Sequence, residues 1–479
     1  MKLHEEFYIG GRWIRARDQK RIELINPADE RPCGGIAVAM PHEVDAAVQA
    51  AKTAFPRWSS STVAERVSTL HSIAAGIAER GAQIAESVTM EMGIPRKLAH
   101  GYQAEPAQMI FSAYAQLLES YSFERAGDLT TVLKEPIGVC GLITPWNFPL
   151  TQIALKLAPA LAAGCTIVLK PSEFVPTAAV ILAQVIDNSG LPAGVFNLIH
   201  GDGATTGAAL CAHPAVDMVS ITGSTRAGAA VTEAAAASIK RVTQELGGKS
   251  PYLILDDADL ETDVIWGVQK CFANSGQACD APTRMLVPAR LYDRAIAFAR
   301  SAAEKLVVGD PTHEATDIGP LANRVQFQKV QRLIREAVGS GATLVTGGVD
   351  GAAKSPGYFV QPTIFGNVDP SSAIAQEEIF GPVLCIIPYR DEDEAVRIAN
   401  DSRYGLAAFI SGRDSSLVER IARRLRCGQV RINRSPFDIG APFGGYKWSG
   451  NGRECGTYGL EEYLETKACM GLPQLQRRA

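Results

Sequence analysis

The sequence predicts an α/β protein with more than one domain. Its 479 residues exceed what one compact core usually holds, so two or three domains are expected. Short, nearly continuous apolar runs alternate with helical stretches, which is typical of parallel strands buried between helical layers. Two such series follow one another, and we place a domain boundary near residue 248.

Composition excludes several functional classes. The chain is 46% hydrophobic and 20% charged, and a net charge of -4 favours neither nucleic acid nor an anionic membrane surface. We expect no signal peptide and no membrane span. The 10 cysteines are scattered without a Cys-x-x-Cys pair, so we expect neither disulfides nor a metal site. These features favour a cytoplasmic enzyme.

The N-terminal third is expected to be helical after a short β start. A hairpin is predicted around Gly10 and Gly11, because two glycines separate two β-prone runs. Apolar residues recur at helical spacing over residues 41–99. Residues 129–136 are β-branched and alternate in polarity, which suggests an exposed strand able to pair with another subunit.

The two α/β series account for the rest of the fold. In the first series, strands are predicted at residues 138–143, 166–169, 195–199 and 216–221, each near a helical stretch. The second series begins at 252–255 and passes through 383–387 to 430–433. Ligands of such sheets bind beyond the carboxyl ends of the strands, so the residues that follow these runs are the candidate site.

Glycine-rich turns are the first candidates for a nucleotide site. Gly223, Ser224 and Gly228 follow a strand and precede a helix expected to begin near Ala227, where free N–H groups favour a diphosphate. Gly203 lies in a second such turn. Neither turn has the Gly-x-Gly-x-x-Gly spacing, and glycine at such a junction is more often structural.

Two polar motifs follow predicted strands. Lys170 and Glu173 could bind ribose hydroxyls, and a carboxylate there favours NAD over NADP; a solvated charge pair is the alternative. Asn147 lies between Pro145 and Pro149, which fix the backbone and could hold its amide as a donor to an oxyanion. The alternative is an ordinary turn asparagine.

Cys279 is the candidate nucleophile. Small residues surround it, and Glu245 is available as a general base. The alternative is a buried structural cysteine, which is the commoner case. The seven histidines lie outside these motifs, so a Cys-His arrangement has no local support. Near the C-terminus, residues 377–382 and 442–454 combine carboxylates, aromatic rings and glycines, although they could be only loops.

Together these motifs resemble the NAD(P)-dependent aldehyde dehydrogenase superfamily along nearly the whole chain. Seven motifs occur in the family's order: Pro-Trp-Asn-Phe-Pro, Lys-Pro-Ser-Glu, Thr-Gly-Ser-Thr-x-x-Gly, Glu-Leu-Gly-Gly-Lys, Gly-Gln-x-Cys, Glu-Glu-Ile-Phe-Gly-Pro and Pro-Phe-Gly-Gly-Tyr-Lys. The ordered set is far more specific than any single motif. The family's atypical Rossmann-like site also explains the unusual glycine spacing.

The resemblance implies a role for each matching residue. Cys279 would be the nucleophile, Glu245 the base, and Asn147 an oxyanion donor with the Cys279 N–H, while Lys156 and Glu454 match positions linked to proton exit. Lys170 and Glu173 would hold the adenosine ribose, Ser224 the diphosphate, Glu378 the nicotinamide ribose, and Phe380 would lie near the nicotinamide. The complete implied cofactor set is Thr144, Trp146, Lys170, Ser172, Glu173, Gly203, Gly223, Ser224, Gly228, Leu246, Glu378 and Phe380.

The implied reaction is oxidation of an aldehyde to a carboxylic acid. The aldehyde would become a thiohemiacetal and then a thioester on Cys279, with hydride passing to NAD and Glu245 activating water. Rival hypotheses are a semialdehyde dehydrogenase with an acidic substrate, a CoA-acylating relative, a thiol esterase and a non-catalytic binding protein. Glu245 argues against the CoA relative, because a base for water serves hydrolysis.

The substrate is expected to be an uncharged aliphatic or aromatic aldehyde. Asp280 departs from the neutral residue more usual after the nucleophile; it could disfavour anionic substrates, raise the thiol pKa, or turn away into a hydrogen bond. Arg434 offers a weaker possibility of binding an acidic substrate. The expected substrate residues are Phe148, Gln152, Leu155, Asp280, Phe437 and Phe443.

The family fold implies two Rossmann-like domains and an oligomerisation arm. The cofactor domain would span residues 1–117 and 137–248, and the catalytic domain residues 249–448. Residues 118–136 and the tail 449–479 would form the arm of a homodimer or homotetramer, because an edge strand is well used when it pairs across subunits.

Overall fold

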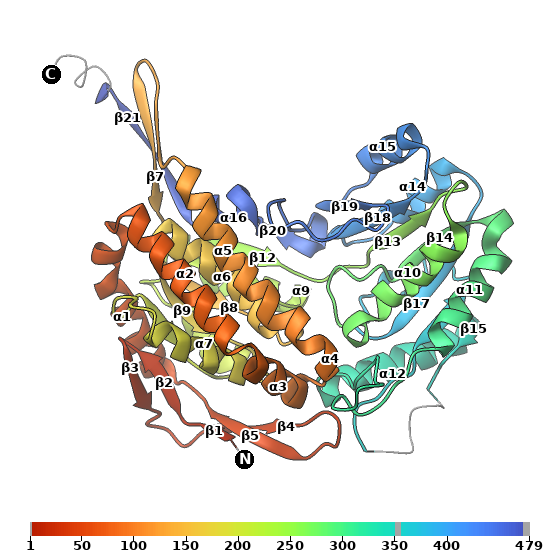
Figure 1. The fold of residues 1–479 in the computed structure, drawn as a ribbon, viewed down its shortest axis with the longest axis horizontal. Coiled ribbons are helices and arrows are strands. Elements are labelled where there is room, and N and C mark those ends of the chain that lie inside the picture. The colour runs from red at the N-terminus through yellow and green to blue at the C-terminus, as the bar shows by residue number, and fades with distance from the viewer. Residues whose placement is uncertain (1, 350–355, 473–479) are drawn as a thin grey trace.

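In the computed structural model, which describes residues 2–349 and 356–472, two large sheets occupy separate halves of the molecule (Figure 1). A small sheet near the N-terminus joins β1 (Lys2–His4), β5 (Pro32–Ala37) and β4 (Arg21–Ile25). Within the described residues, no helix combines the length and hydropathy needed to cross a membrane.

The first large sheet has eight strands in the order β20-β12-β11-β8-β9-β10-β2-β3. The central strands are parallel, as predicted, while β2, β3 and β20 pair in antiparallel fashion at the edges. β12 carries Glu245 at its end and was missing from the predicted strands. The bounds are β2 (Glu6–Ile9), β3 (Arg12–Arg15), β8 (Val139–Ile143), β9 (Thr166–Lys170), β10 (Phe196–Leu198), β11 (Met218–Thr222), β12 (Arg241–Glu245) and β20 (Gly450–Asn451).

Helices cover both faces of this sheet. Alternate residues of β9 divide between the two faces: Val168 packs with α1, α8 and α9, whereas Ile167 and Leu169 pack with α2, α5, α6 and α7. α9 begins at Thr225, two residues before the predicted start. The helices are α1 (Pro41–Ser59), α2 (Val63–Glu79), α3 (Gly81–Met92), α4 (Arg96–Ala99), α5 (Glu105–Ser120), α6 (Pro149–Ala163), α7 (Thr177–Asp187), α8 (Ala208–Ala212) and α9 (Thr225–Ala236), with π-helical turns η1 (His100–Ala104) and η2 (Gly203–Gly207).

The second large sheet has seven strands in the order β15-β16-β17-β14-β13-β18-β19, all parallel except β15. Its strands are β13 (Pro251–Ile254), β14 (Arg284–Pro288), β15 (Thr343–Thr346), β16 (Thr363–Gly366), β17 (Val383–Tyr389), β18 (Ala407–Ser411) and β19 (Gln429–Ile432). One face packs on α10 and α11, the other on α12, α13, α14 and α15. These helices are α10 (Leu260–Phe272), α11 (Tyr292–Glu304), α12 (Arg324–Gly339), α13 (Ala373–Gln376), α14 (Glu392–Asn400) and α15 (Ser415–Arg424), with short helical turns η3 (Ala273–Gly276), η4 (Ala289–Leu291) and η5 (Lys447–Ser449). The predicted α/β class is therefore confirmed.

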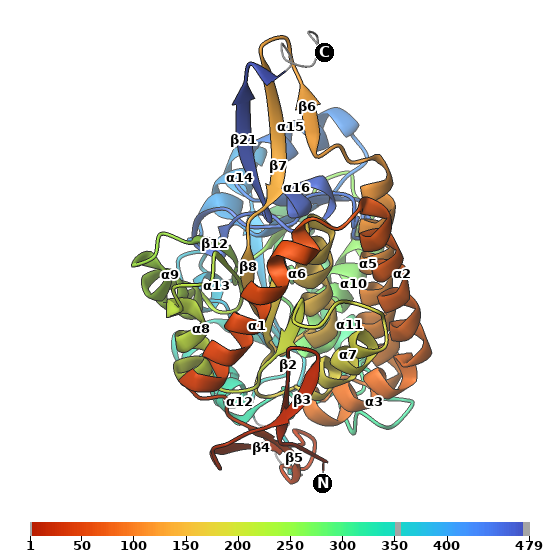
Figure 2. The same cartoon turned by 90° about the vertical axis from the view of Figure 1, so that its left-hand side faces the viewer.

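A three-stranded antiparallel sheet projects from the first half of the molecule (Figures 1 and 2). β7 (Thr130–Pro136) is its central strand, flanked by β6 (Glu124–Ala126) and by β21 (Leu464–Met470), which follows α16 (Gly456–Glu461). The strand predicted at residues 129–136 is present, but it is not free to pair with another subunit, because both of its neighbours come from the same chain. Within the described residues, β6 and β21 are the outer strands of this sheet. The last part of the predicted tail, 473–479, lies outside the described residues.

Candidate active site

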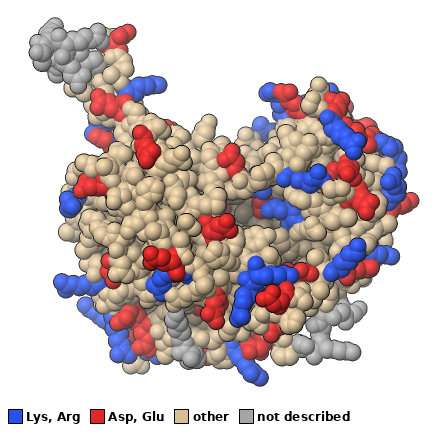
Figure 3. All heavy atoms as spheres, viewed as in Figure 1, with Lys and Arg blue, Asp and Glu red and all other residues tan. Residues whose placement is uncertain are grey.

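One cavity of about 580 Å³ lies where the two halves meet, and the surface is hollowed between them (Figure 3). Segments after β8, β11 and β12 reach it from one half, and η3, α12 and the loop before β17 approach from the other. Eight predicted site residues line it: Trp146, Asn147, Gly223, Ser224, Leu246, Cys279, Glu378 and Phe380. Residues far apart in the sequence are thus brought to one place.

A left-handed turn directs Cys279 into this cavity. Asn274, Ser275 and Gly276 have φ of 53°, 57° and 72°. At Gly276 glycine is required, because a Cβ there would lie 2.1 Å from the carbonyl oxygen of Gly381. The turn directly follows α10, and Cys279, which as a whole residue is partly exposed, comes three residues after it and lines the cavity.

The Asn147 amide is held by a buried hydrogen-bond network. Its Nδ2 donates to the backbone oxygen of Gln277 at 3.0 Å. Asn274 Nδ2 donates to the backbone oxygens of Asn147 at 3.0 Å and Gln277 at 3.3 Å. An amide nitrogen has two donors, so Asn147 can keep one for the substrate. Asn274 and Gln277 were not predicted as positioning residues, although Gln277 belongs to the Gly-Gln-x-Cys motif and Asn274 lies five residues before Cys279.

A buried acidic pair lies behind the nucleophile. Glu245 Oε2 and Glu454 Oε2 have no hydrogen-bond partner within the described part of the chain. Glu454 Oε1 accepts a charge-assisted bond from Lys156 Nζ at 2.6 Å, and Lys156 also bonds Ser220 Oγ at 3.2 Å. Burial, and then the charge of Glu454, raise the pKa of Glu245 well above its ordinary value. Glu245 is therefore a stronger base than an exposed glutamate.

Burial also raises the pKa of the Cys279 thiol well above its ordinary value, and nearby carboxylates add to the effect in the order Asp280, Glu378, Glu245 and Glu454. The thiol of the free protein is therefore neutral at pH 7. A cationic group in the cavity, or a base, would favour the thiolate.

The far wall of the cavity combines a carboxylate with aromatic rings. Glu378 Oε1 accepts a bond from Gly248 N at 3.1 Å, and burial raises its pKa. The rings of Phe380 and Trp146 meet edge to face at 5.3 Å. Lys329 Nζ donates to the backbone oxygen of Glu378 at 2.6 Å. Lys329 and Gln326 of α12 also line the cavity, although the sequence analysis did not predict them. Their three-residue spacing, which places both on one face of a helix, is the sequence feature that could have indicated them.

Six predicted cofactor residues lie outside the lining of this cavity: Thr144, Lys170, Ser172, Glu173, Gly203 and Gly228. Lys170 Nζ bonds Glu173 Oε2 at 3.2 Å, with the lysine buried and the glutamate partly exposed, so the two residues form a charge pair, but not the solvated one of the alternative hypothesis. A Cβ at Gly228 would lie 2.7 Å from Leu246 Cδ1, so this glycine is needed for packing. At Gly203 a Cβ would meet no atom within 4 Å.

Aromatic residues gather on the substrate side. Phe148 contacts the Tyr102 ring at 6.0 Å, and Phe437 contacts Phe443 edge to face at 5.7 Å. Gln152 and Leu155 are buried on α6, and Leu155 belongs with Phe443 to the apolar cluster against which Cys279 packs.

The two charged residues considered for the substrate are both engaged. Arg434 bonds Asp263 at 3.0 Å, away from the cavity lining, which removes the support for an acidic substrate there. The carboxylate of Asp280 forms ion pairs with Lys270 and Arg431, which agrees with the alternative that this side chain is turned toward a bonding partner.

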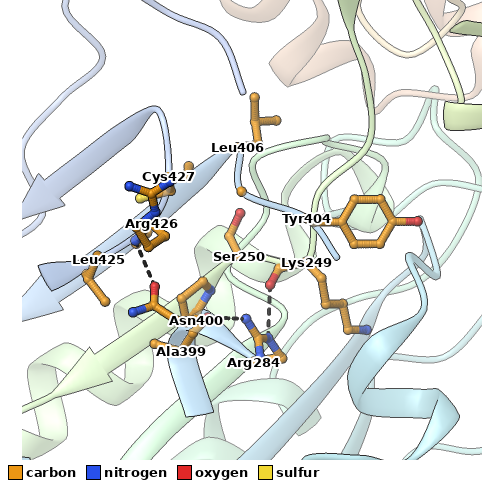
Figure 4. Close-up of a pocket in the computed structure, with 14 residues that line it drawn as sticks. Lys249, Ser250, Arg284, Ala399, Asn400, Tyr404, Leu406, Leu425, Arg426 and Cys427 are labelled. Carbon is orange, nitrogen blue, oxygen red and sulfur yellow. Dashed lines mark hydrogen bonds between the residues drawn. The ribbon is translucent and has the colours of Figure 1, made fainter. Parts of the chain in front are cut away.

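A second, smaller cavity of about 270 Å³ lies beside β13 and β14 (Figure 4). Arg284 is buried there, and its guanidinium donates to backbone oxygens of Lys249, Ile398 and Ala399, each at 2.9 Å. The ammonium of Lys249 points away from Arg284 and Arg426 (Figure 4), so these cations do not converge on one ligand. This cavity is structural.

The fold and the site together define an aldehyde-oxidising class of protein, and comparison with known proteins agrees. The sequence model of the aldehyde dehydrogenase family matches residues 13–469. The chain is 51% identical to 3-succinoylsemialdehyde-pyridine dehydrogenase of Pseudomonas sp, over 98% of this chain and 99% of that protein.

Solved structures agree closely with the fold. A mutant aldehyde dehydrogenase C from Pseudomonas syringae, in complex with NAD⁺ and octanal, superposes with a TM-score of 0.96 at 48% identity, over 98% of this chain and 96% of that one. An aldehyde dehydrogenase from Bartonella henselae gives 0.96 at 42% identity, over 98% and 100%. The chain belongs to the aldehyde dehydrogenase family and is an oxidoreductase.

Proposed function

We propose that this chain oxidises an uncharged aldehyde to a carboxylic acid, with NAD⁺ as the hydride acceptor and a thioester on Cys279 as intermediate. The observation that carries the proposal is the shared cavity: a thiol, a rigidly held amide and a carboxylate–aromatic wall line one space, with a buried carboxylate behind it. Nucleophile, oxyanion donor, cofactor wall and base are thus available together.

The cavity suits a dinucleotide. Glu378 and Lys329 would hold the nicotinamide ribose, and Ser224 with the first N–H groups of α9 would receive the diphosphate. A Cβ at Gly247 would lie 2.4 Å from the Glu378 carboxylate, so glycine keeps that wall in place. The Glu173 carboxylate would bind a ribose hydroxyl and repel a 2′-phosphate, which favours NAD over NADP. The bound nicotinamide supplies the hydride acceptor.

Cys279 performs the first covalent step. Its thiolate adds to the aldehyde carbon, and the resulting oxyanion is stabilised by the free N–H of Asn147 Nδ2 and by the Cys279 backbone N–H. The carbonyl re-forms as the carbon loses hydride, which leaves a thioester. The Asn147 amide is already fixed by its hydrogen bonds, so it can stabilise the oxyanion without rearranging during the reaction.

Glu245 serves the second step. Its unprotonated form takes a proton from water, the hydroxide attacks the thioester, and the thiolate of Cys279 departs from the acid product. The raised pKa of Glu245 makes it a stronger base than an exposed glutamate. Glu454 and Lys156, joined at 2.6 Å, extend from it as a path by which the proton leaves.

An uncharged aldehyde with an apolar or aromatic chain is the proposed substrate. Phe148, Phe437 and Phe443 provide ring surfaces, while Arg434 is occupied by Asp263. The dehydrogenase from Pseudomonas sp is named for a pyridine-bearing semialdehyde, and the P. syringae structure contains octanal. Octanal carries its aldehyde on an apolar chain, and the aldehyde in the other name includes an aromatic ring.

Oligomeric state, location and domain limits are also proposals. The free edges of β6 and β21 would pair with a second copy, giving a homodimer or homotetramer. The free cysteines suit the reducing cytoplasm. The two large sheets are consistent with domains of 1–117 plus 137–248 and 249–448.

NADH formation tests the proposal. Octanal should reduce NAD⁺ and be converted to the acid, and Cys279→Ala should abolish this activity because no thioester can form. Cys33→Ala is the matched control, since Cys33 is also partly exposed but lies on β5. Activity retained by Cys279→Ala would contradict the mechanism. Equal rates with NADP⁺ would count against Glu173, and formation of an acyl-CoA on adding CoA would favour the rival reaction.

A further inference from the structure

The carboxylate of Asp280, the residue after the nucleophile, is held between two cations. Its Oδ2 lies 3.2 Å from the guanidinium of Arg431 and 3.6 Å from Lys270 Nζ, and its side chain is 14% exposed. Burial alone would raise the pKa of Asp280, but Lys270 and then Arg431 bring it below its ordinary value. Asp280 is therefore ionised, and its charge is compensated by Lys270 on α10 and Arg431 on β19.

Arg431 also supports an aromatic ring. It lies on β19 in register with Phe409 of β18, and its guanidinium is 5.6 Å from the centre of the Phe409 ring and 5.3 Å from that of Phe437. Its Nε donates to Gln429 Oε1 at 3.0 Å. The arginine is buried, whereas Phe437 is 38% exposed. A planar guanidinium carries several N–H donors and a flat face, so it serves two rings and a carboxylate better than the compact ammonium of lysine.

We propose that Arg431 is a specificity-determining residue: it cancels the charge of Asp280 beside the nucleophile and fixes the Phe437 ring, so that the site accepts uncharged aldehydes with apolar or aromatic chains. This inference rests on the proposed function, since it places Phe437 at the mouth of an aldehyde site. Arg431 acts through Asp280 and Phe437, and it is a positioning residue.

The charges around Cys279 explain why this compensation matters. Four carboxylates act on the thiol, and Asp280 has the largest effect among them. Glu454 is paired with Lys156, and Lys329 lies in the same cavity as Glu378. If Arg431 is lost, Lys270 still opposes the Asp280 charge, but the nearer and more buried of the two cations is gone. The thiol would then ionise less readily, and anions would be repelled from it.

Alkylation of Cys279 tests the charge component without aldehyde or cofactor. Neutral iodoacetamide and anionic iodoacetate are compared over a pH series, and the peptide containing Cys279 is followed by mass spectrometry. Arg431→Met should lower the iodoacetate-to-iodoacetamide rate ratio about tenfold and move the alkylation midpoint to higher pH. Adding Asp280→Asn to Arg431→Met should return both values to those of the unaltered protein.

Turnover tests the substrate component. Asp280→Asn alone leaves Arg431 uncompensated, so kcat/KM for 4-oxobutanoate relative to butanal should rise about tenfold. Arg431→Met should raise KM for phenylacetaldehyde about tenfold, because Phe437 loses its support. The double variant should keep this KM defect while its pH profile recovers. A purely structural role would not separate the two effects.

Arg434→Met is the matched control. Arg434, three residues after Arg431, also pairs with an aspartate, Asp263 on α10, whereas the ion pairs of Asp280 are with Lys270 and Arg431. Its alkylation ratio should be unchanged. An unchanged ratio in Arg431→Met, or failure of the double variant to restore it, overturns the inference. If no aldehyde gives NADH with the unaltered protein, the proposed function fails and the specificity claim falls with it, whereas the alkylation result still decides the charge compensation.

Discussion

Replacing Asn274 with alanine should impair catalysis far more than folding. The change removes the donor that holds the Asn147 backbone oxygen at 3.0 Å and one of two donors to Gln277. A buried carbonyl left without a partner costs about 1–3 kcal/mol, and alanine at the φ of 53° adds about 1 kcal/mol more. A destabilisation of about 2–4 kcal/mol is therefore expected.

The catalytic effect should be larger because Asn147 loses its orientation. Misplacing one oxyanion donor costs roughly 10²-fold, so kcat and kcat/KM should fall together by about that factor. Ser275→Ala is the matched control: it removes a hydrogen bond of the same turn, from Ser275 Oγ to Gly319 at 2.9 Å, without touching Asn147. Steady-state NADH formation and circular dichroism are measured on both variants. Equal kcat losses in the two folded variants would refute the reasoning.

Two further predictions concern buried charges. Glu454→Gln should lower the pKa of Glu245, because the charge of Glu454 raises it. The acidic limb of the pH–kcat profile should then move to lower pH. A movement to higher pH would contradict the role of Glu245 as the general base. Lys249→Met should raise the free energy of unfolding by about 1–3 kcal/mol at pH 7, because burial lowers the pKa of Lys249 to about 8 and its Nζ has no hydrogen-bond partner within residues 2–349 and 356–472. Below pH 8 the lysine is charged in both the folded and the unfolded state, so the full cost of burying its charge is present, whereas above the unfolded pKa near 10.5 this cost disappears. Denaturant titrations at pH 7 and 10 should therefore show that the stability gained by Lys249→Met is smaller at pH 10. A loss of stability at pH 7 would contradict this prediction.

Local sequence patterns were sufficient to predict most of the fold. The apolar runs that predicted β8, β9, β11, β13 and β17 were readable because buried parallel strands leave no alternation to disguise them. β12 was missed because its residues Arg-Val-Thr-Gln-Glu are largely polar, and only its place in the sheet makes it a strand. The arm was expected from residues 118–136 and the tail 449–479, but the sequence did not show that β21 of this tail pairs with β7 along its whole length.

Ordered motifs and apolar periodicity are local properties of a chain, so they were enough to predict the family, the α/β class and the candidate nucleophile. What surrounds those residues follows from the tertiary structure. Asn274 reaches Asn147 across 127 positions, and Asp280 meets Arg431 on β19. Such contacts depend on which strands become neighbours and on burial, which sets the strength of each charge. The question of Asp280 is therefore answered by Arg431, which no local pattern connects to it.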